Sequence, residues 1–193
     1  MELIFATHNN NKVKEVTKML PSYLSMKSLT DIHFFDEIEE TGETFEENAQ
    51  LKAKIIFEKT GKNIFADDSG LVIEALNGAP GVYSHRYAGT GRDEDNIAKA
   101  LKELEGKTNR KAYFISVFCL ILNEKEYFFE GRVNGTIATE TLGDNGFGYD
   151  PIFIPDGHTK SFAQMTAEEK NTISHRGKAV EKLNEFLTNL NVN

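Results

Sequence analysis

Two adjacent carboxylates, Asp67 and Asp68, follow the short apolar run at residues 64–66. Carboxylates at the end of a buried strand are costly unless a cation neutralises them. Mg²⁺ prefers oxygen ligands and is often held by one or two carboxylates together with substrate phosphates. Successive residues of a strand point to opposite sides, so the two carboxylates need not share one role. The pair indicates a magnesium site, while an Asx turn at a strand end is the structural alternative.

A polar loop near the amino terminus has the features of an anion site. It joins the apolar residues 2–6 to apolar positions at helical spacing, and its members are Thr7, His8, Asn9, Asn10, Asn11 and Lys12. A helix N-terminus presents backbone N–H groups to an anion, and Lys12 adds a full positive charge. The alternative is an asparagine-rich cap with the lysine in solvent. A Walker loop is excluded because Gly-x-x-x-x-Gly-Lys-Ser/Thr is absent.

A second group of charged and amide side chains lies between residues 40 and 53. Glu40 precedes a glycine turn, and Thr44 with Glu47 fits a capping box at the start of a helix. Asn48 and Lys52 are four residues apart and therefore share one face of that helix. This face would carry an amide and a cation toward a site, although a solvated helix surface gives the same pattern.

Two segments in the second half of the chain fit recognition of a base. The glycines of residues 143–150 do not follow the dinucleotide order Gly-x-Gly-x-x-Gly, but the loop presents Phe147 for stacking and Asp150 for hydrogen bonding. A tight turn with Phe147 in the core is the alternative. Lys170, His175 and Arg176 supply donors suited to phosphate or a purine O6 atom, or else form an exposed basic turn.

The elements that must position these residues alternate along the chain. Apolar periodicity predicts helices over about residues 13–20, 44–60, 93–105 and 179–190. Apolar runs predict strands near residues 2–6, 64–66, 71–76, 112–122, 126–130 and 133–139, with a hairpin turn at residues 123–125. Interspersed helices and strands predict an α/β or α+β fold with a mixed sheet and a cleft between two lobes. No linker divides residues 1–193, so we expect a single domain.

Composition limits the classes of function. The net charge of −8 disfavours binding to nucleic acid polymers. Cys119 is the single cysteine and lies in an apolar run, which predicts a buried structural thiol and excludes a cysteine-rich zinc site. The amino terminus lacks the pattern of a signal peptide, and no apolar run approaches the roughly 18 residues of a membrane span. We expect a cytoplasmic protein with no membrane association.

Six motifs in this order resemble the inosine/xanthosine triphosphate pyrophosphatase family, the non-canonical purine nucleoside triphosphate pyrophosphatases. They cover almost the whole chain and are Thr7-x-Asn9-x-x-Lys12, Glu40-Thr41-Gly42-x-Thr44-Phe45-x-x-Asn48-Ala49-x-x-Lys52-Ala53, Asp67-Asp68-Ser69-Gly70-Leu71, Gly78-Ala79-Pro80-Gly81-x-Tyr83-Ser84-x-Arg86-Tyr87, Gly146-Phe147-Gly148-Tyr149-Asp150-Pro151 and Ser174-His175-Arg176. His8 stands where many relatives have glycine.

The resemblance implies an activity and an assembly. The family splits ITP, XTP and their deoxy forms into monophosphate and pyrophosphate, which clears deaminated purines from the nucleotide pool. Its fold is an elongated two-lobed α/β domain with a central mixed β-sheet flanked by helices and a cleft between the lobes. The usual assembly is a homodimer, and the cofactor is Mg²⁺.

The resemblance also implies a role for each matched residue. Glu40 and Asp68 look like the Mg²⁺ ligands, Asp68 is also the expected proton acceptor, and Asp67 supports it. The substrate-binding set implied is Thr7, His8, Asn9, Asn10, Asn11, Lys12, Lys52, Ser69, Phe147, Gly148, Tyr149, Asp150, Lys170, His175 and Arg176. Donors at His175 and Arg176 would accept the O6 atom of hypoxanthine and leave the amino group of adenine unmatched.

Two other functions fit parts of the sequence. A nucleotide-binding or sensing module without catalysis would use the same lysines and donors, but it would gain nothing from Asp67 and Asp68 unless a metal were present. An RNA-binding protein is disfavoured by the negative charge and by the lack of an aromatic RNA-binding signature.

Overall fold

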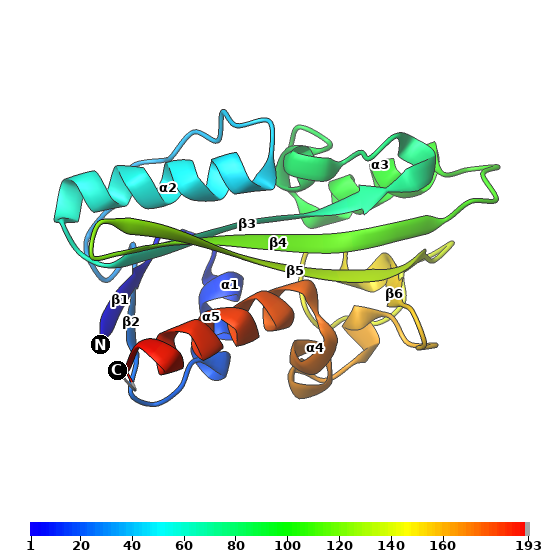
Figure 1. Cartoon of the computed structure of the whole chain (residues 1–193). Helices are drawn as coiled ribbons and strands as arrows, with labels where there is room; N and C mark the ends of the chain where they lie inside the picture. The colour runs from blue at the N-terminus through cyan, green and yellow to red at the C-terminus, as the bar shows by residue number, and fades with distance from the viewer. Residues whose placement is uncertain (192–193) are drawn as a thin grey trace. The chain divides into compact units, whose positions relative to one another are not determined.

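A mixed β-sheet with flanking helices forms the protein, as the computed structural model shows for residues 1–191 (Figure 1). Within these residues the sheet has six strands in the order β2-β1-β3-β4-β5-β6. The strands are β1 (Glu2–Phe5), β2 (Ser25–Ser28), β3 (Ile64–Ile73), β4 (Lys111–Leu122), β5 (Lys125–Ile137) and β6 (Phe153–Pro155). The helices are α1 (Asn10–Met19), α2 (Phe45–Thr60), α3 (Asp93–Glu103), α4 (Ala167–Ile173) and α5 (His175–Asn191).

The pairing of the strands makes the sheet mixed. β1 pairs in parallel with both β2 and β3, whereas β5 and β6 are antiparallel. Asn123 and Glu124, both with positive φ, connect β4 to β5, as a two-residue hairpin turn requires. The predicted α/β class with a mixed central sheet is confirmed.

The chain forms two compact units. Within the described residues, the first contains residues 1–68, 116–131 and 176–191, and the second contains residues 69–115 and 132–175. The long strands β3, β4 and β5 contribute residues to both units. The single domain, the elongated shape and the cleft stay predictions. None of the described helices is long and apolar enough to cross a membrane.

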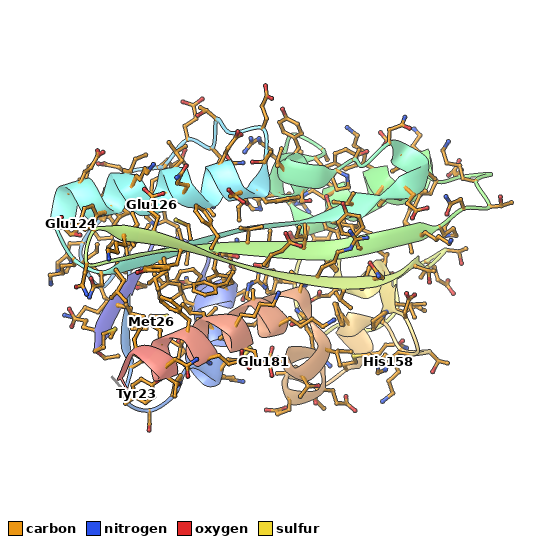
Figure 2. The ribbon with its side chains drawn as sticks, in the orientation of Figure 1. Tyr23, Met26, Glu124, Glu126, His158 and Glu181 are labelled. Carbon is orange, nitrogen blue, oxygen red and sulfur yellow. The ribbon has the colours of Figure 1, made fainter. Side chains whose placement is uncertain are left out.

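In the first unit, helices cover both faces of the sheet. α2 lies on one face, and α1 and α5 lie on the other (Figure 1). Alternation along β3 sorts its side chains accordingly: Phe65 packs with the α1 and α5 residues, and Ala66 packs with the α2 residues. The Tyr23 hydroxyl lies 2.9 Å from the Thr188 hydroxyl, which places it beside the end of α5 (Figure 2).

The second unit has a core rich in phenylalanine. Phe114 of β4 and Phe153 of β6 meet edge to face with ring centroids 4.7 Å apart, and Phe162 lies 5.2 Å from Phe153. Leu71 and Ile73 of β3 and the inner face of α3 belong to the same buried cluster. Tyr149 belongs to this cluster as well, so the loop of residues 143–150 is attached to the aromatic core.

Local signals in the sequence predicted the positions of most helices correctly, but they predicted fewer of the strand ends. Thr44 and Glu47 form the predicted capping box, and Gly61 ends α2 in the left-handed conformation. A second capping box at Thr166 and Glu169 starts α4. The expectation that the strand ends before Asp67 is wrong, because β3 runs without a break to Ile73. The short edge strands β2 and β6 were not predicted.

Candidate active site

The two aspartates of β3 point to opposite faces of the strand. Asp67 shares the face of Phe65, toward α1 and α5, and is completely buried. Asp68 shares the face of Ala66, toward α2, and is 5% exposed. The pair is thus not an Asx turn but two neighbouring strand positions that serve two separate clusters of side chains.

Asp67 is the centre of a buried ionic network. The Lys12 ammonium lies 3.0 Å from its Oδ1 atom, and the Arg176 Nη2 atom lies 3.4 Å from its Oδ2 atom. The Ser116 hydroxyl donates to the same Oδ2 atom at 3.5 Å. Glu15 of α1 pairs with the Arg176 Nη1 atom at 2.6 Å. Asp67 therefore fixes two cations, which fits its predicted supporting role.

The charge balance of this network keeps Asp67 ionised. Burial raises the pKa of Asp67, but the nearby charges of Lys12 and Arg176 outweigh it and lower the pKa to about 2. Burial lowers the pKa of Lys12, and Asp67 opposes that effect. At neutral pH the network holds Asp67 as an ionised carboxylate that is a weaker proton acceptor than an ordinary aspartate.

Asp68 contacts the first turns of α2. The Asn48 side-chain amide donates to its Oδ2 atom at 3.1 Å, and the Lys52 ammonium lies 3.9 Å from its Oδ1 atom. Lys52 also pairs closely with Glu40. The Asn48 side-chain oxygen accepts the Gly42 N–H at 2.8 Å, so the turn that carries Glu40 is tied to the same helix face.

In this second cluster the pKa of the aspartate is raised, whereas the pKa of Asp67 is lowered. Burial raises the pKa of Asp68; Lys52 opposes this, and Glu40 adds to it. Burial lowers the pKa of Lys52, but Asp68 and Glu40 outweigh it and raise that pKa. Of the two neighbouring aspartates, Asp68 is thus the one whose carboxylate binds a proton more readily.

The donor set around Lys52 fits a hard cation. Glu40 and Asp68 both approach one ammonium group, so their oxygens converge on a position that favours positive charge. Asp67 does not join them. Among residues 1–191 no group of three or more His, Cys, Asp or Glu side chains is arranged to hold a metal ion. Two carboxylates completed by substrate phosphates are the arrangement common for Mg²⁺.

The amino-terminal loop is organised by Asn9. Its side-chain oxygen caps α1 by accepting the backbone N–H groups of Asn11 at 2.9 Å and Lys12 at 3.2 Å, and its own N–H donates to the Thr7 hydroxyl at 3.1 Å. The asparagine cap of the structural alternative is present, but its expectation of a lysine in solvent is wrong, because Lys12 pairs with the buried Asp67. Anion binding by this loop stays a prediction. Asn10 lies on the exposed side of the first turn.

His8 links this loop to residues 29–40. Its Nε2 atom lies 3.0 Å from the Asp36 carbonyl oxygen, and its ring stacks on Phe34 at a centroid distance of 6.1 Å. The histidine side chain is exposed and belongs to the same unit as Lys12 and Lys52.

In the second unit, the loop of residues 146–150 is closed by a carboxylate. Asp150 accepts the Phe147 N–H at 3.0 Å and the Lys170 ammonium at 2.6 Å on one oxygen. The ammonium lies 4.9 Å from the centre of the Phe147 ring. Phe147 is half-buried, so it is not the core residue of the alternative interpretation. Asp150 thus shapes the loop that carries the ring.

The remaining predicted residues are more deeply placed. Tyr149 is buried, and its hydroxyl donates to the Ser84 carbonyl oxygen at 2.7 Å. His175 is buried and stacks on Phe114 with ring centroids 4.7 Å apart. Gly148 adopts a positive φ and donates its N–H to Asp93. Ser69 is half-buried in β3, directly after Asp68.

The structure therefore collects the predicted residues into two groups, one within each unit. The first holds Thr7–Lys12, Glu40, Lys52, Asp67, Asp68 and Arg176, and the second holds Ser69, Phe147–Asp150, Lys170 and His175. Arg176, which sequence reasoning assigned to the base pocket, forms ion pairs with Glu15 and Asp67. Its contact with a base stays a prediction.

Several contributing residues were missed by sequence reasoning. Glu15 lies three positions after Lys12 and so shares a helix face with it, which was a usable signal. Ser116 is the one hydroxyl-bearing residue in the apolar part of β4 that reaches Asp67. Asp93 gave no signal beyond its place at the start of a helix.

Comparison with known proteins places the chain in a defined group. The model of the Ham1 family matches residues 3–186. The dITP/XTP pyrophosphatase of Flavobacterium psychrophilum is 50% identical over 190 residues, covering 98% of this chain and 100% of that protein. The dITP/XTP pyrophosphatase of Bacillus subtilis is 50% identical over 191 residues, covering 96% of each.

Solved structures agree with this assignment. The Ham1 protein of Staphylococcus aureus superposes with a TM-score of 0.89 at 40% identity, covering 98% of this chain and 99% of that one. A Ham1 protein of Coxiella burnetii gives a TM-score of 0.90 at 42% identity with the same coverage.

Proposed function

Because the chain belongs to the Ham1 family, we propose that it is a pyrophosphatase for non-canonical purine nucleoside triphosphates. It hydrolyses ITP, XTP and their deoxy forms to the monophosphate and pyrophosphate, and so removes deaminated purines from the nucleotide pool. The names and full-length similarity of the dITP/XTP pyrophosphatases support the activity. The observation that carries the chemistry is the buried Asp68, whose pKa is raised, beside Lys52 and Glu40.

Asp68 is the proposed proton acceptor for the attacking water. A carboxylate whose pKa lies above its usual value binds the proton of water more readily than an ordinary aspartate. Asn48 holds one of its oxygens through a hydrogen bond, which fixes the direction of the other. Asp67 stays ionised with Lys12 and Arg176 and supports the strand position of its neighbour.

Glu40 and Asp68 are the proposed ligands of Mg²⁺. When bound there, the metal supplies charge stabilisation to the phosphates and lowers the pKa of bound water. The remaining roles, substrate binding and charge compensation, fall to side chains of the protein. Lys12, Lys52, Ser69 and the loop of residues 7–12 hold the triphosphate, and the two lysines offset the charge that develops on the pyrophosphate leaving group.

The residues of the second group, with Arg176, are proposed to recognise the base. Phe147 stacks on the purine, and Gly148, Tyr149 and Asp150 shape the loop around it. Lys170, His175 and Arg176 carry donors, which match the O6 acceptor of hypoxanthine and xanthine. Adenine presents an amino group at the same place, and each buried donor left unpaired costs about 1–3 kcal/mol.

The setting of the enzyme is proposed from the same family assignment. We propose that residues 1–193 act as one functional domain in a homodimer, in the cytoplasm, with the small nucleotide as substrate. The net charge of −8 speaks against nucleic acid polymers as partners. Sedimentation and light scattering of the purified chain test the dimer.

A product assay tests the activity. Purified protein is incubated with ITP, XTP, GTP and ATP in the presence of Mg²⁺, and the products are separated by anion exchange. We expect pyrophosphate and the monophosphate from ITP and XTP. Orthophosphate as the first product, or tight ITP binding without turnover, would overturn the proposal in favour of another hydrolase or of a sensing module.

Asp68→Asn tests the role of the aspartate in that assay. The substitution removes the proton acceptor and one negative charge, so we expect turnover to be lost while the thermal unfolding transition is retained. Glu58→Gln, on the exposed side of α2, is the matched control for loss of one carboxylate. Full activity of Asp68→Asn would rule out Asp68 as the base.

A further inference from the structure

We propose that Asp93 is a positioning residue that orients Phe147 and thereby sets the selectivity for the purine base. Asp93 is the first residue of α3, and its Oδ2 atom accepts the backbone N–H of Gly148 at 2.7 Å across 55 positions of sequence. The inference rests on the proposed function, because it assigns base stacking to Phe147. None of the sequence motifs contains Asp93.

The hydrogen bonds around Phe147 fix both peptide planes that flank it. Asp150 accepts the Phe147 N–H, which belongs to the peptide plane before the Phe147 Cα atom. Asp93 accepts the Gly148 N–H, which belongs to the peptide plane after it. With both planes held, the φ and ψ angles of Phe147 are set, and so is the direction of its Cα–Cβ bond. The two carboxylates therefore set the direction in which the Phe147 side chain leaves the backbone.

This restraint on Phe147 matters because the two flanking glycines allow the loop backbone to adopt other conformations. Gly146 and Gly148 both have positive φ, at +76° and +61°, and glycine adopts many backbone conformations. Asp93 is a charged acceptor, and hydrogen bonds to ionised groups are stronger than those between neutral groups. Removal of its carboxylate leaves the second peptide plane with the hydrogen bond from the Asp150 N–H to the Phe147 carbonyl oxygen at 3.3 Å, which is longer than the 2.7 Å bond to Asp93.

Other contacts keep the loop attached to the second unit when Asp93 is changed. The Asn145 side-chain amide donates to the Met165 carbonyl oxygen, and the Asn145 N–H donates to the Ala163 carbonyl oxygen. The Tyr149 hydroxyl donates to the Ser84 carbonyl oxygen. Loss of Asp93 should therefore release the orientation of the Phe147 ring without detaching the loop. The expected effect is on base selectivity and not mainly on stability.

A role of Asp93 in the stability of α3 is the competing explanation. Acidic residues in the first turn interact favourably with the helix dipole, and Glu94 and Asp95 also lie in that turn. Glu94 is highly exposed and contacts only Arg92 among the described ion pairs. Glu94→Ala removes the same charge from the same helix end without touching the loop, so it separates the two explanations.

The activity experiment compares Asp93→Ala, Asp93→Asn and Glu94→Ala with the unmodified protein. For each, kcat and KM are measured with ITP and with ATP. Asp93→Ala should lower the ITP-to-ATP ratio of kcat/KM about tenfold, mainly through KM, which is the loss expected for one charge-assisted hydrogen bond. Asp93→Asn keeps an oxygen acceptor and should recover most of the ratio, and Glu94→Ala should leave it unchanged.

A second measurement tests the hydrogen bond between Asp93 and Gly148 without using turnover. Hydrogen exchange of the Gly148 amide should be faster in Asp93→Ala than in Glu94→Ala at equal global stability, because the acceptor is gone. If Asp93→Ala does not fold, Asp93→Ser serves, since its hydroxyl is too short to replace the carboxylate. An unchanged ITP-to-ATP ratio or unchanged Gly148 exchange overturns the inference. If the unmodified protein is inactive on ITP while Gly148 exchange is faster in Asp93→Ala, the proposed function alone is overturned.

Discussion

The side chain of Asn48 joins Asp68 to the turn that carries Glu40. Its amide nitrogen donates to the Asp68 Oδ2 atom at 3.1 Å, and its amide oxygen accepts the Gly42 N–H at 2.8 Å. Asn48 is fully buried in the first turn of α2, one turn before Lys52. One amide thus sets the relative positions of the two carboxylates proposed to bind Mg²⁺.

Asn48→Ala should weaken the proposed metal site. Without the amide, Asp68 and the Gly42 N–H each lose a buried partner, and the Oδ2 atom of the aspartate loses the hydrogen bond from Asn48. Loss of such an outer partner typically costs about 10–100-fold in metal affinity or activity. We expect the Mg²⁺ concentration for half-maximal ITP hydrolysis to rise. Gln50→Ala, on the same helix but bonded to Glu126, is the control. An unchanged Mg²⁺ dependence would contradict the role of Asn48.

Asp67→Asn should destabilise the protein most near neutral pH. Its carboxylate has a folded-state pKa of about 2 against the ordinary 3.8, so the folded state releases this proton more readily than the unfolded state. The stabilisation, about 2 kcal/mol at 1.4 kcal/mol per pKa unit, is present above pH 3.8 and is lost as the pH falls toward 2.

Denaturant unfolding between pH 3 and pH 7 measures this dependence. The difference in unfolding free energy between the unmodified protein and Asp67→Asn should be largest at pH 7 and should shrink below about pH 4. Asp36→Asn, which affects only the exposed pair with Lys59, is the control and should show little difference at any pH. A difference independent of pH would show that Asp67 acts through shape and not through charge.

Cys119 should be inert toward thiol reagents in the folded protein. Burial raises the pKa of its thiol to about 12, so on the order of one molecule in ten thousand carries the reactive thiolate at pH 8. Labelling with iodoacetamide, followed by mass spectrometry, should be slow in buffer and fast in denaturant. Rapid labelling of the native protein would contradict the burial of Cys119 in the core beneath α2.

The local signals of the sequence were sufficient for much of the fold. Thr44, Glu47 and Gly61 delimit α2 because caps depend only on neighbouring residues. The alternation of side chains along a strand also indicated that Asp67 and Asp68 point to opposite faces and need not share one role. That prediction needed no knowledge of what lies on either face.

Partners distant in sequence were beyond the reach of these signals. The pairing of Arg176 with Glu15, separated by 161 positions, depends on the packing of α5 beside α1. The hydrogen bond from the Gly148 N–H to Asp93 likewise requires that α3 lie against a loop 55 positions later. β2 has only four residues and gains its stability from pairing with β1. The β-propensity of its own residues does not reveal such a pairing.

Gly146→Ala should disrupt the loop that carries Phe147 more than Gly148→Ala does. Both glycines have positive φ, so each substitution strains the backbone by about 1 kcal/mol or more. A Cβ atom at position 146 would also come within 2.0 Å of the Asp150 Oδ2 atom, whereas none of the described atoms lies within 4 Å of a Cβ atom at position 148. The overlap would displace the oxygen that accepts from Phe147 and Lys170.

The two alanine variants share the strain and differ in the overlap, so their comparison isolates the contact with Asp150. We expect Gly146→Ala to raise the KM for ITP further than Gly148→Ala and to lower the unfolding temperature further, because the buried Lys170–Asp150 pair is disturbed. Steady-state kinetics and differential scanning calorimetry measure both effects. Equal losses in the two variants would mean that backbone strain alone governs the loop and that Asp150 does not hold it.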